Sequence, residues 1–270
     1  MFNLHTIFTL LALIAYLTSF LYLLHHFVKQ STASPFFVWS TLSIGLIVHA
    51  LTLSLDMVTA QGINYEVFNL ISFTSELMLL LSLIFSIYRP VLILNLISTP
   101  IAMLGLMVGS LLSTSGHVIR QQGVGMDIHI ILSLSAYAVL FMATLHAILI
   151  WLQNRELKRK LKQRIWVNIL PSLQTMESLL FDLILIGFVL LTAALSFGFF
   201  TIQDFFAQHL VHKTVFSIIS WLIYGGLLLG HWRFGWRGQK AIRFTLLGFV
   251  LLAIGFIGSK FVLELILMRS

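Results

Sequence analysis

Residues 178–200 read SLLFDLILIGFVLLTAALSFGFF and carry one charged side chain, Asp182. A bilayer core about 30 Å thick is crossed by about 20 apolar residues in a helix, so this stretch predicts a transmembrane helix. Further stretches of the same kind lie at 3–24, 36–57, 67–88, 91–112, 128–151, 214–232 and 241–267. The expected fold class is therefore all-α, a polytopic transmembrane helix bundle of about eight spans.

The overall composition supports a membrane protein. Hydrophobic residues make up 59% of the 270 residues and charged residues 9%, with a mean hydropathy of +1.01. Soluble domains are about 45–50% apolar and about 25% charged. The net charge of +7 is spread too thinly among apolar residues to predict nucleic-acid binding. The absence of cysteine excludes disulfide scaffolds, thiolate metal sites and CxxC redox chemistry.

Basic residues predict the orientation of the spans. With the N-terminus outside, 12 of the 16 Lys and Arg residues lie on the inner side, and four lie outside: Arg120, Lys213, Lys260 and Arg269. This asymmetry predicts an N-out, C-out topology. No Lys or Arg precedes Lys29, so the first span is expected to be a retained helix and not a signal peptide. The connections are short, which predicts a single transmembrane domain over residues 1–270.

Two features modify this simple layout. Pro35, Pro90 and Pro171 lie between spans, whereas Pro100 lies within the fourth span and is expected to bend it. The longest inner connection, 152–177, contains the basic run RELKRKLKQRIW. It is expected to bind anionic lipid head groups, and the alternative is a docking surface for a cytoplasmic protein partner.

Signatures of catalysis are missing from the sequence. It contains no GxxxxGK[ST], GxGxxG, HExxH or GxSxG motif, so we do not expect an enzyme. Carboxylates expected to be embedded in the membrane are few: Glu76, Asp182 and Glu264. Glu76 either makes a polar contact between helices or, together with Lys260 and the bend at Pro100, belongs to a small-solute or ion transporter.

Histidine is unusually frequent, with ten residues against nine acidic ones. A neutral imidazole can bind a metal in an apolar environment, and two imidazoles on different helices can hold a haem iron. Their positions predict an outer group that includes His129, His212 and His49, and an inner group that includes His146 and His231. The candidate haem pairs are His129 with His212 on the outer side, and His231 with His146 or His49 inside. Asp127, two residues before His129, is a candidate to orient its ring.

An aromatic segment accompanies the later outer histidines. Residues 199–213 read FFTIQDFFAQHLVHK and place four phenylalanines beside His209 and His212: Phe199, Phe200, Phe205 and Phe206. They form either an apolar platform for a porphyrin or an aromatic belt at the membrane interface.

Three segments resemble a known family: AQGINYEVFNLISFTSEL (60–77), the helix DIHIILSLSAYAVLFMATLHAILIWLQNREL (127–157), and 212–267, which ends in GSKFVLELIL. They are similar to the cytochrome c assembly family of integral membrane proteins (CcsA/CcmC type), in particular its HemX/YpjD-like branch of eight spans. The resemblance is strongest over 60–89 and 127–267. It implies a bacterial inner-membrane protein that handles haem b in cytochrome c assembly or in the regulation of haem biosynthesis. It also implies that His129 is the family's outer histidine and His231 its transmembrane haem ligand.

The chain departs from the family pattern in two places. The tryptophan-rich WWD stretch is replaced by QDFFAQHLVHKT (203–214), and Gly258-Ser259-Lys260 stands where a second outer histidine is expected. A haem held among the helices therefore fits better than presentation at the outer site. The alternative is an accessory membrane subunit that has kept the fold without the cofactor and binds a partner through its basic loop.

Overall fold

The computed structural model describes residues 3–59, 62–89, 91–112, 119–120, 124–158, 170–201 and 208–261, with side chains described for all of these except 119–120, 208–212 and 256–261. The chain forms two compact units. The N-terminal unit comprises Met1–Gln122 and Arg164–Pro171, and the C-terminal unit comprises Gly123–Gln163 and Ser172–Ser270.

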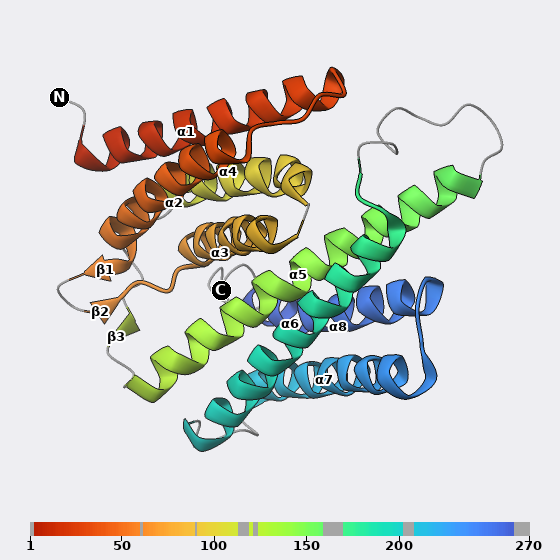
Figure 1. Ribbon diagram of the computed structural model, residues 1–270. Helices are drawn as coiled ribbons and strands as arrows, with labels where there is room; N and C mark the ends of the chain where they lie inside the picture. The colour runs from red at the N-terminus through yellow and green to blue at the C-terminus, as the bar shows by residue number, and fades with distance from the viewer. Residues whose placement is uncertain are drawn as a thin grey trace. The chain divides into compact units, whose positions relative to one another are not determined.

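The N-terminal unit contains four long helices, α1 (Leu4–Val28), α2 (Pro35–Met57), α3 (Val67–Tyr88) and α4 (Asn95–Leu112), with a 3-10 turn, η1 (Leu92–Leu94), before α4. The helix α1 packs against α2 and α4, and α3 packs against α2 and α4 (Figure 1). Three two-residue strands, β1 (Val58–Thr59), β2 (Gly62–Ile63) and β3 (Ile119–Arg120), form a small antiparallel sheet in the order β1-β2-β3. The sequence patterns did not predict this sheet, since strands of two residues carry no periodicity.

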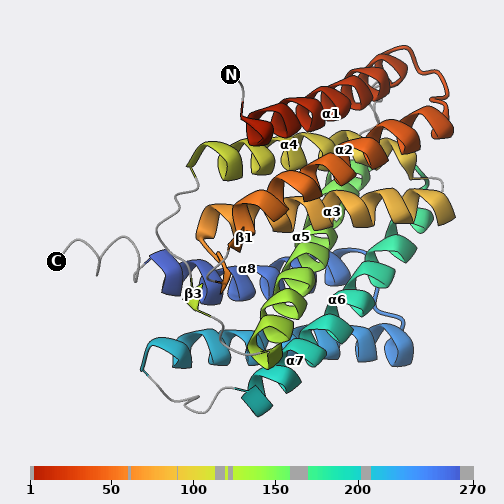
Figure 2. The ribbon, with the colours of Figure 1, turned by 90° about the vertical axis from the view of Figure 1, so that its left-hand side faces the viewer.

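The C-terminal unit consists of α5 (Val124–Lys158), α6 (Leu173–Thr201), α7 (Gln208–Phe234) and α8 (Gln239–Phe261). The helix α6 packs along α5 and also contacts α7, and α8 packs against α5 and α7 (Figure 2). Tyr137 of α5 donates its hydroxyl to the carbonyl oxygen of Leu252 at 2.8 Å, which joins α5 to α8. The pocket described below lies at one end of the α6–α7 pair.

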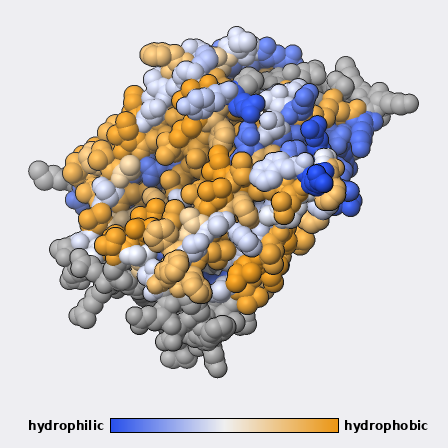
Figure 3. Space-filling view, turned by 60° about the horizontal axis from the view of Figure 1, so that its bottom comes forward, coloured by the Kyte–Doolittle hydropathy of each residue, from blue (hydrophilic) through white to orange (hydrophobic). Residues whose placement is uncertain are grey.

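These elements confirm the all-α polytopic fold. Among the described residues, seven helices are long and apolar enough to cross a membrane, and α8 covers most of the eighth predicted span, 241–267. Apolar side chains spread over the surface seen in Figure 3, as expected for contact with lipid tails. The N-out, C-out topology and the bend at Pro100 stay predictions, and α4 is helical on both sides of Pro100.

Small residues bring α3 and α4 together. A Cβ on Gly105 would collide with the Ser75 side chain, and one on Gly109 would lie 2.8 Å from the Ser72 Cβ. Glycines four residues apart on a membrane helix allow this close approach, because they have no side chain to keep the backbones apart. Close packing matters here, since lipid provides no hydrophobic force to drive helices together. The buried serines of α3 therefore face the glycine side of α4.

Candidate functional site

His231 stands in the last turn of α7, and the end of that helix fixes its ring. Gly235 adopts φ +64°, a left-handed conformation that favours glycine, and terminates the helix. The Gly235 N–H bonds to the His231 carbonyl oxygen at 3.1 Å, and the Trp236 N–H bonds to the Gly230 carbonyl oxygen at 3.1 Å. This turn folds Trp236 back, so that its carbonyl oxygen accepts a hydrogen bond from His231 Nδ1 at 2.9 Å.

The His231 ring also rests on α6. It stacks on the Phe181 ring with the ring centroids 3.6 Å apart and the planes inclined by 17°. Phe181 is buried, so it provides a rigid surface for the imidazole. The ring of His231 is therefore held by a hydrogen bond in its plane and by an aromatic contact on its face.

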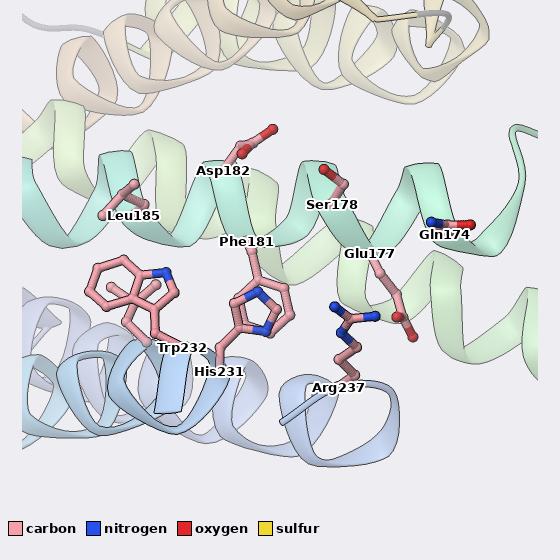
Figure 4. Close-up of a pocket in the computed structure, with 10 residues that line it drawn as sticks. Gln174, Glu177, Ser178, Phe181, Asp182, Leu185, His231, Trp232 and Arg237 are labelled. Atoms are coloured by element: carbon pink, nitrogen blue, oxygen red, sulfur yellow. The ribbon is translucent and has the colours of Figure 1, made fainter. Parts of the chain in front are cut away.

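A pocket of about 300 Å³ opens beside His231 between α6 and the end of α7. Figure 4 shows the ring of His231 against Phe181, with Trp232 on one side and Arg237 on the other. The lining residues are Gln174, Glu177, Ser178, Phe181, Asp182, Leu185, Leu228, His231, Trp232 and Arg237. Both α6 and the end of α7 contribute apolar side chains and polar or charged ones to this lining.

Charges of both signs line this pocket. Glu177 and Arg237 face each other in Figure 4, and neither makes an ion pair within 4.0 Å with any residue that the structure describes. Asp182 contributes a second carboxylate to the lining. The Arg237 guanidinium thus keeps hydrogen-bond donors available for a ligand.

His129 is held between α5 and α6. Its Nδ1 donates to the Ala194 carbonyl oxygen at 2.8 Å, and a Cβ on Gly198 would lie 2.9 Å from its Cε1 atom. The partner of His129 Nδ1 is thus a backbone carbonyl of α6 and not the candidate Asp127. His129 lies in the second turn of α5, because that helix begins at Val124, earlier than the predicted 128.

His146 is almost completely buried in α5, with 4% of its surface exposed. Its Nδ1 donates to the Met142 carbonyl oxygen of the same helix at 3.0 Å. Its Nε2 atom has no hydrogen-bond partner among the residues that the structure describes. A buried polar atom in this state is uncommon in folded proteins and is a candidate for ligand binding.

His129, His146 and His231 share one protonation pattern. Each ring directs Nδ1 to a backbone carbonyl oxygen, which can only accept a hydrogen bond. The proton of the neutral ring is therefore on Nδ1, and Nε2 carries the lone pair. Metal-binding histidines commonly show this arrangement, because the second hydrogen bond fixes both the tautomer and the orientation of the ring.

His49 differs from these three and belongs to the N-terminal unit. It is fully buried, with Nδ1 3.2 Å from the Tyr16 hydroxyl and Nε2 2.8 Å from Ser72 Oγ. Both ring nitrogens thus have a hydrogen-bond partner within the unit. Its side chain joins α1, α2 and α3.

The remaining predicted site residues fall mostly outside the described side chains. Phe205 and Phe206 lie outside the described residues, and His212 is in the first turns of α7, where only the backbone is described. Phe199 and Phe200 end α6 with 69% and 85% of their surfaces exposed, so both side chains point outward from the unit. The porphyrin platform proposed for these four residues stays a prediction.

Sequence patterns missed the groups that surround His231. Phe181, Glu177 and Arg237 carry no motif, and a backbone carbonyl such as that of Trp236 leaves no trace in residue identity. The FGWRG run at 234–238 was the one available signal, because glycines at the end of an apolar helix mark a helix-terminating turn.

Comparison with known proteins identifies the family of this chain. The family model described as "Cytochrome C assembly protein" matches residues 39–267. The chain belongs to this family. It is also similar to "Inner membrane protein YpjD" of Escherichia coli strain K12, with 30% identity over 264 residues, which cover 96% of this chain and 99% of the relative. A second relative, "Uncharacterized 28.8 kDa protein in nifR3-like 5'region" of Azospirillum brasilense, is 33% identical over 147 residues, 54% of each chain.

No solved structure matches the chain. The chain is similar to an inner membrane protein over nearly its whole length, and it has several helices that can span a membrane. This member of the cytochrome c assembly protein family is therefore a multi-pass protein of the bacterial inner membrane.

Proposed function

We propose that this protein binds haem b within its C-terminal unit, where His231 would hold the iron. The observation that carries the proposal is the state of the His231 ring. Its Nδ1 proton is directed to the Trp236 carbonyl, which leaves Nε2 as a metal-binding nitrogen in a residue that lines the pocket.

The residues of this pocket fit a haem group. A haem iron accepts a neutral imidazole nitrogen, and the apolar macrocycle suits Leu185, Leu228 and Trp232 of the lining. His146 is a further candidate ligand, because its Nε2 is also unprotonated and has no hydrogen-bond partner among the described residues. His129 contacts Ala194, which lies 13 residues or about 20 Å along α6 from Phe181, so it would serve a separate haem. When bound, the haem supplies a one-electron redox centre, while the chain's own residues orient the ligand and exclude water.

Membership of the cytochrome c assembly family supports a role in haem handling, in cytochrome c assembly or in the regulation of haem biosynthesis. The role proposed is binding, not catalysis. The basic segment 152–177 would contact lipid head groups or a cytoplasmic partner. Residues 159–169 of that segment lie outside the described residues.

An absorption spectrum of the purified protein tests the proposal. Protein in mild detergent, supplied with haem, is expected to show the sharp reduced spectrum of a six-coordinate b-type haem at about one haem per chain. His231→Ala is expected to weaken or broaden that spectrum, whereas His25→Ala, at the exposed inner end of α1, leaves it unchanged. A wild-type protein that stays colourless, or a His231→Ala protein with the wild-type spectrum, contradicts the assignment.

The interior of the N-terminal unit favours a second candidate function, the passage of an ion or small solute. Several fully buried polar atoms there have no hydrogen-bond partner among the described residues: Ser19 Oγ, both amide atoms of Asn69, Asn95 Oδ1 and Thr99 Oγ1. Unpaired polar atoms at membrane depth are tolerated where they face water or a substrate.

Glu76 lies on the same face of α3 as Asn69 and Ser72, at helical spacings of seven and four residues. Ion flux into proteoliposomes tests this candidate function. This candidate function is supported if Glu76→Gln abolishes the flux and Glu66→Gln, at the start of α3, keeps it. Equal flux in wild type and Glu76→Gln removes it.

A further inference from the structure

We propose that Arg237 recognises a carboxylate side chain of the porphyrin, and so makes the pocket selective for haem that carries free propionates. The inference rests on the proposed haem function and deepens it. It assigns a specificity-determining role to a residue that no sequence motif singles out.

One turn of backbone positions both His231 and Arg237. The left-handed Gly235 reverses the chain after α7, and the next residue, Trp236, receives the His231 Nδ1 proton on its carbonyl oxygen. Arg237 follows directly and lines the same pocket. A second left-handed glycine, Gly238 with φ +57°, then leads into α8. The spacing between imidazole and guanidinium is therefore set by a short, closed segment.

The Trp236 side chain braces this segment. Its ring stacks on Phe244 of α8 with the centroids 5.4 Å apart, and the Lys240 Nζ atom lies 5.4 Å from its centroid. The ring also fills the space over Gly230, where a Cβ would collide with it. These contacts of Trp236 therefore hold the turn that carries Arg237.

The chemistry of Arg237 selects the ligand group. A guanidinium is always charged, and its planar donors match a carboxylate in a bidentate geometry. Arg237 makes no ion pair within 4.0 Å with a described residue, so a ligand carboxylate does not have to displace a protein one. Haem offers an iron for His231 Nε2 and carboxylates at one edge, which suits an imidazole and a guanidinium in one pocket.

The acidic groups of the pocket oppose the effect of Arg237 on the binding of an anionic ligand. Glu177 faces Arg237, and Asp182 lies about one turn further along α6. Both carboxylates repel an anionic ligand and reduce the advantage that Arg237 provides. Removal of the Glu177 charge is therefore expected to increase the selectivity for free propionates, and removal of the Arg237 charge to decrease it.

Comparison of haem with haem dimethyl ester tests this inference, because the ester keeps the iron and the macrocycle but loses both carboxylate charges. The full-length protein in detergent is titrated with each porphyrin, and the two dissociation constants are compared. Wild type is expected to favour haem about tenfold, the size of one partly exposed charge-assisted hydrogen-bonded pair. Arg237→Gln is expected to lose the preference for haem and to bind the ester at least as tightly, because Glu177 and Asp182 remain, and Glu177→Gln is expected to raise the preference.

Arg233→Gln is the matched control, since Arg233 is an exposed arginine of the same helix end that does not line the pocket. It is expected to keep the wild-type preference. Equal wild-type affinity for haem and ester overturns the inference, and so does an Arg237→Gln protein that keeps the preference. A protein that binds neither porphyrin overturns the proposed function itself. His231→Ala is expected to weaken the binding of both porphyrins and to keep the preference, because both carry the iron. A His231→Ala protein that binds both porphyrins as tightly as wild type removes His231 as the iron ligand and leaves the role of Arg237 standing.

Discussion

The His231 imidazole and the Trp236 carbonyl oxygen are joined by a 2.9 Å hydrogen bond across the turn that ends α7. The bond spans five residues and exists because Gly235 reverses the chain between them. It fixes the ring tautomer, and with it the nitrogen that remains available to a ligand. The geometry of the site therefore depends on a backbone conformation that few residues adopt.

The Gly235→Ala variant is expected to weaken this turn. An L-residue in the left-handed region costs about 1 kcal/mol or more, so the apparent unfolding temperature in detergent should fall. Haem binding should weaken at the same time, because the Trp236 carbonyl moves away from His231. Gly226→Ala is the control, since a Cβ there meets no atom within 4 Å. Equal stability of the two variants would show that the turn tolerates a side chain.

The Gly198→Ala variant tests the close packing of His129 on α6. Alanine gains up to about 1 kcal/mol over glycine in a helix. Its Cβ would lie 2.9 Å from His129 Cε1, and overpacking of this kind costs about 1–3 kcal/mol, so a net loss of stability is expected. Thermal unfolding of the single and double variants measures it. His129→Ala should restore stability to Gly198→Ala, and simple additivity would contradict the contact.

The Tyr16→Phe variant removes one hydroxyl from the buried His49 network. The lost hydrogen bond, 3.2 Å long, should reduce stability by about 1 kcal/mol, in the range measured for hydrogen bonds between membrane helices. Thermal unfolding in detergent gives the difference. Tyr88→Phe is the control, because Tyr88 is 78% exposed and should show no change. A Tyr16→Phe protein as stable as wild type would mean that His49 finds another partner.

The predicted N-out topology can be tested with single cysteines, because the chain has none of its own. Asn3→Cys precedes α1, and Thr32→Cys lies between α1 and α2. In spheroplasts a membrane-impermeant maleimide should label Asn3→Cys at once and Thr32→Cys only after the membrane is opened. The cysteine-free parent controls for background labelling. The reverse pattern would place the N-terminus in the cytoplasm and invert every assignment of inner and outer histidines.

The sequence predicted the membrane spans well where the lipid bilayer sets their length. The predicted spans 36–57 and 67–88 match α2 and α3 to within one residue, since a bilayer demands about 20 apolar residues per crossing. Boundaries were less accurate at α5 and α7, where polar residues continue the helix at its ends. The observed α7 begins at Gln208, whereas 214 was expected, so His212 is helical and not part of a loop.

Hydrogen-bond partners were the least predictable feature of the candidate site. Asp127 was a candidate to orient His129, although two residues apart on one helix is poor geometry for it, and the observed partner is the carbonyl of Ala194, 65 residues away. Whether His49 faces lipid or protein was also open in the sequence, and the structure buries it completely between Tyr16 and Ser72.

The sequence by itself determined that this chain crosses a membrane many times and that histidine is its main source of metal-binding chemistry. Those properties follow from composition and from the length of apolar runs, which act along a single helix. The tertiary structure alone decided which nitrogen of His129, His146 and His231 keeps its lone pair, and which charges share a pocket with His231. Both depend on backbone carbonyls and helix contacts, and these are created only when distant segments pack together.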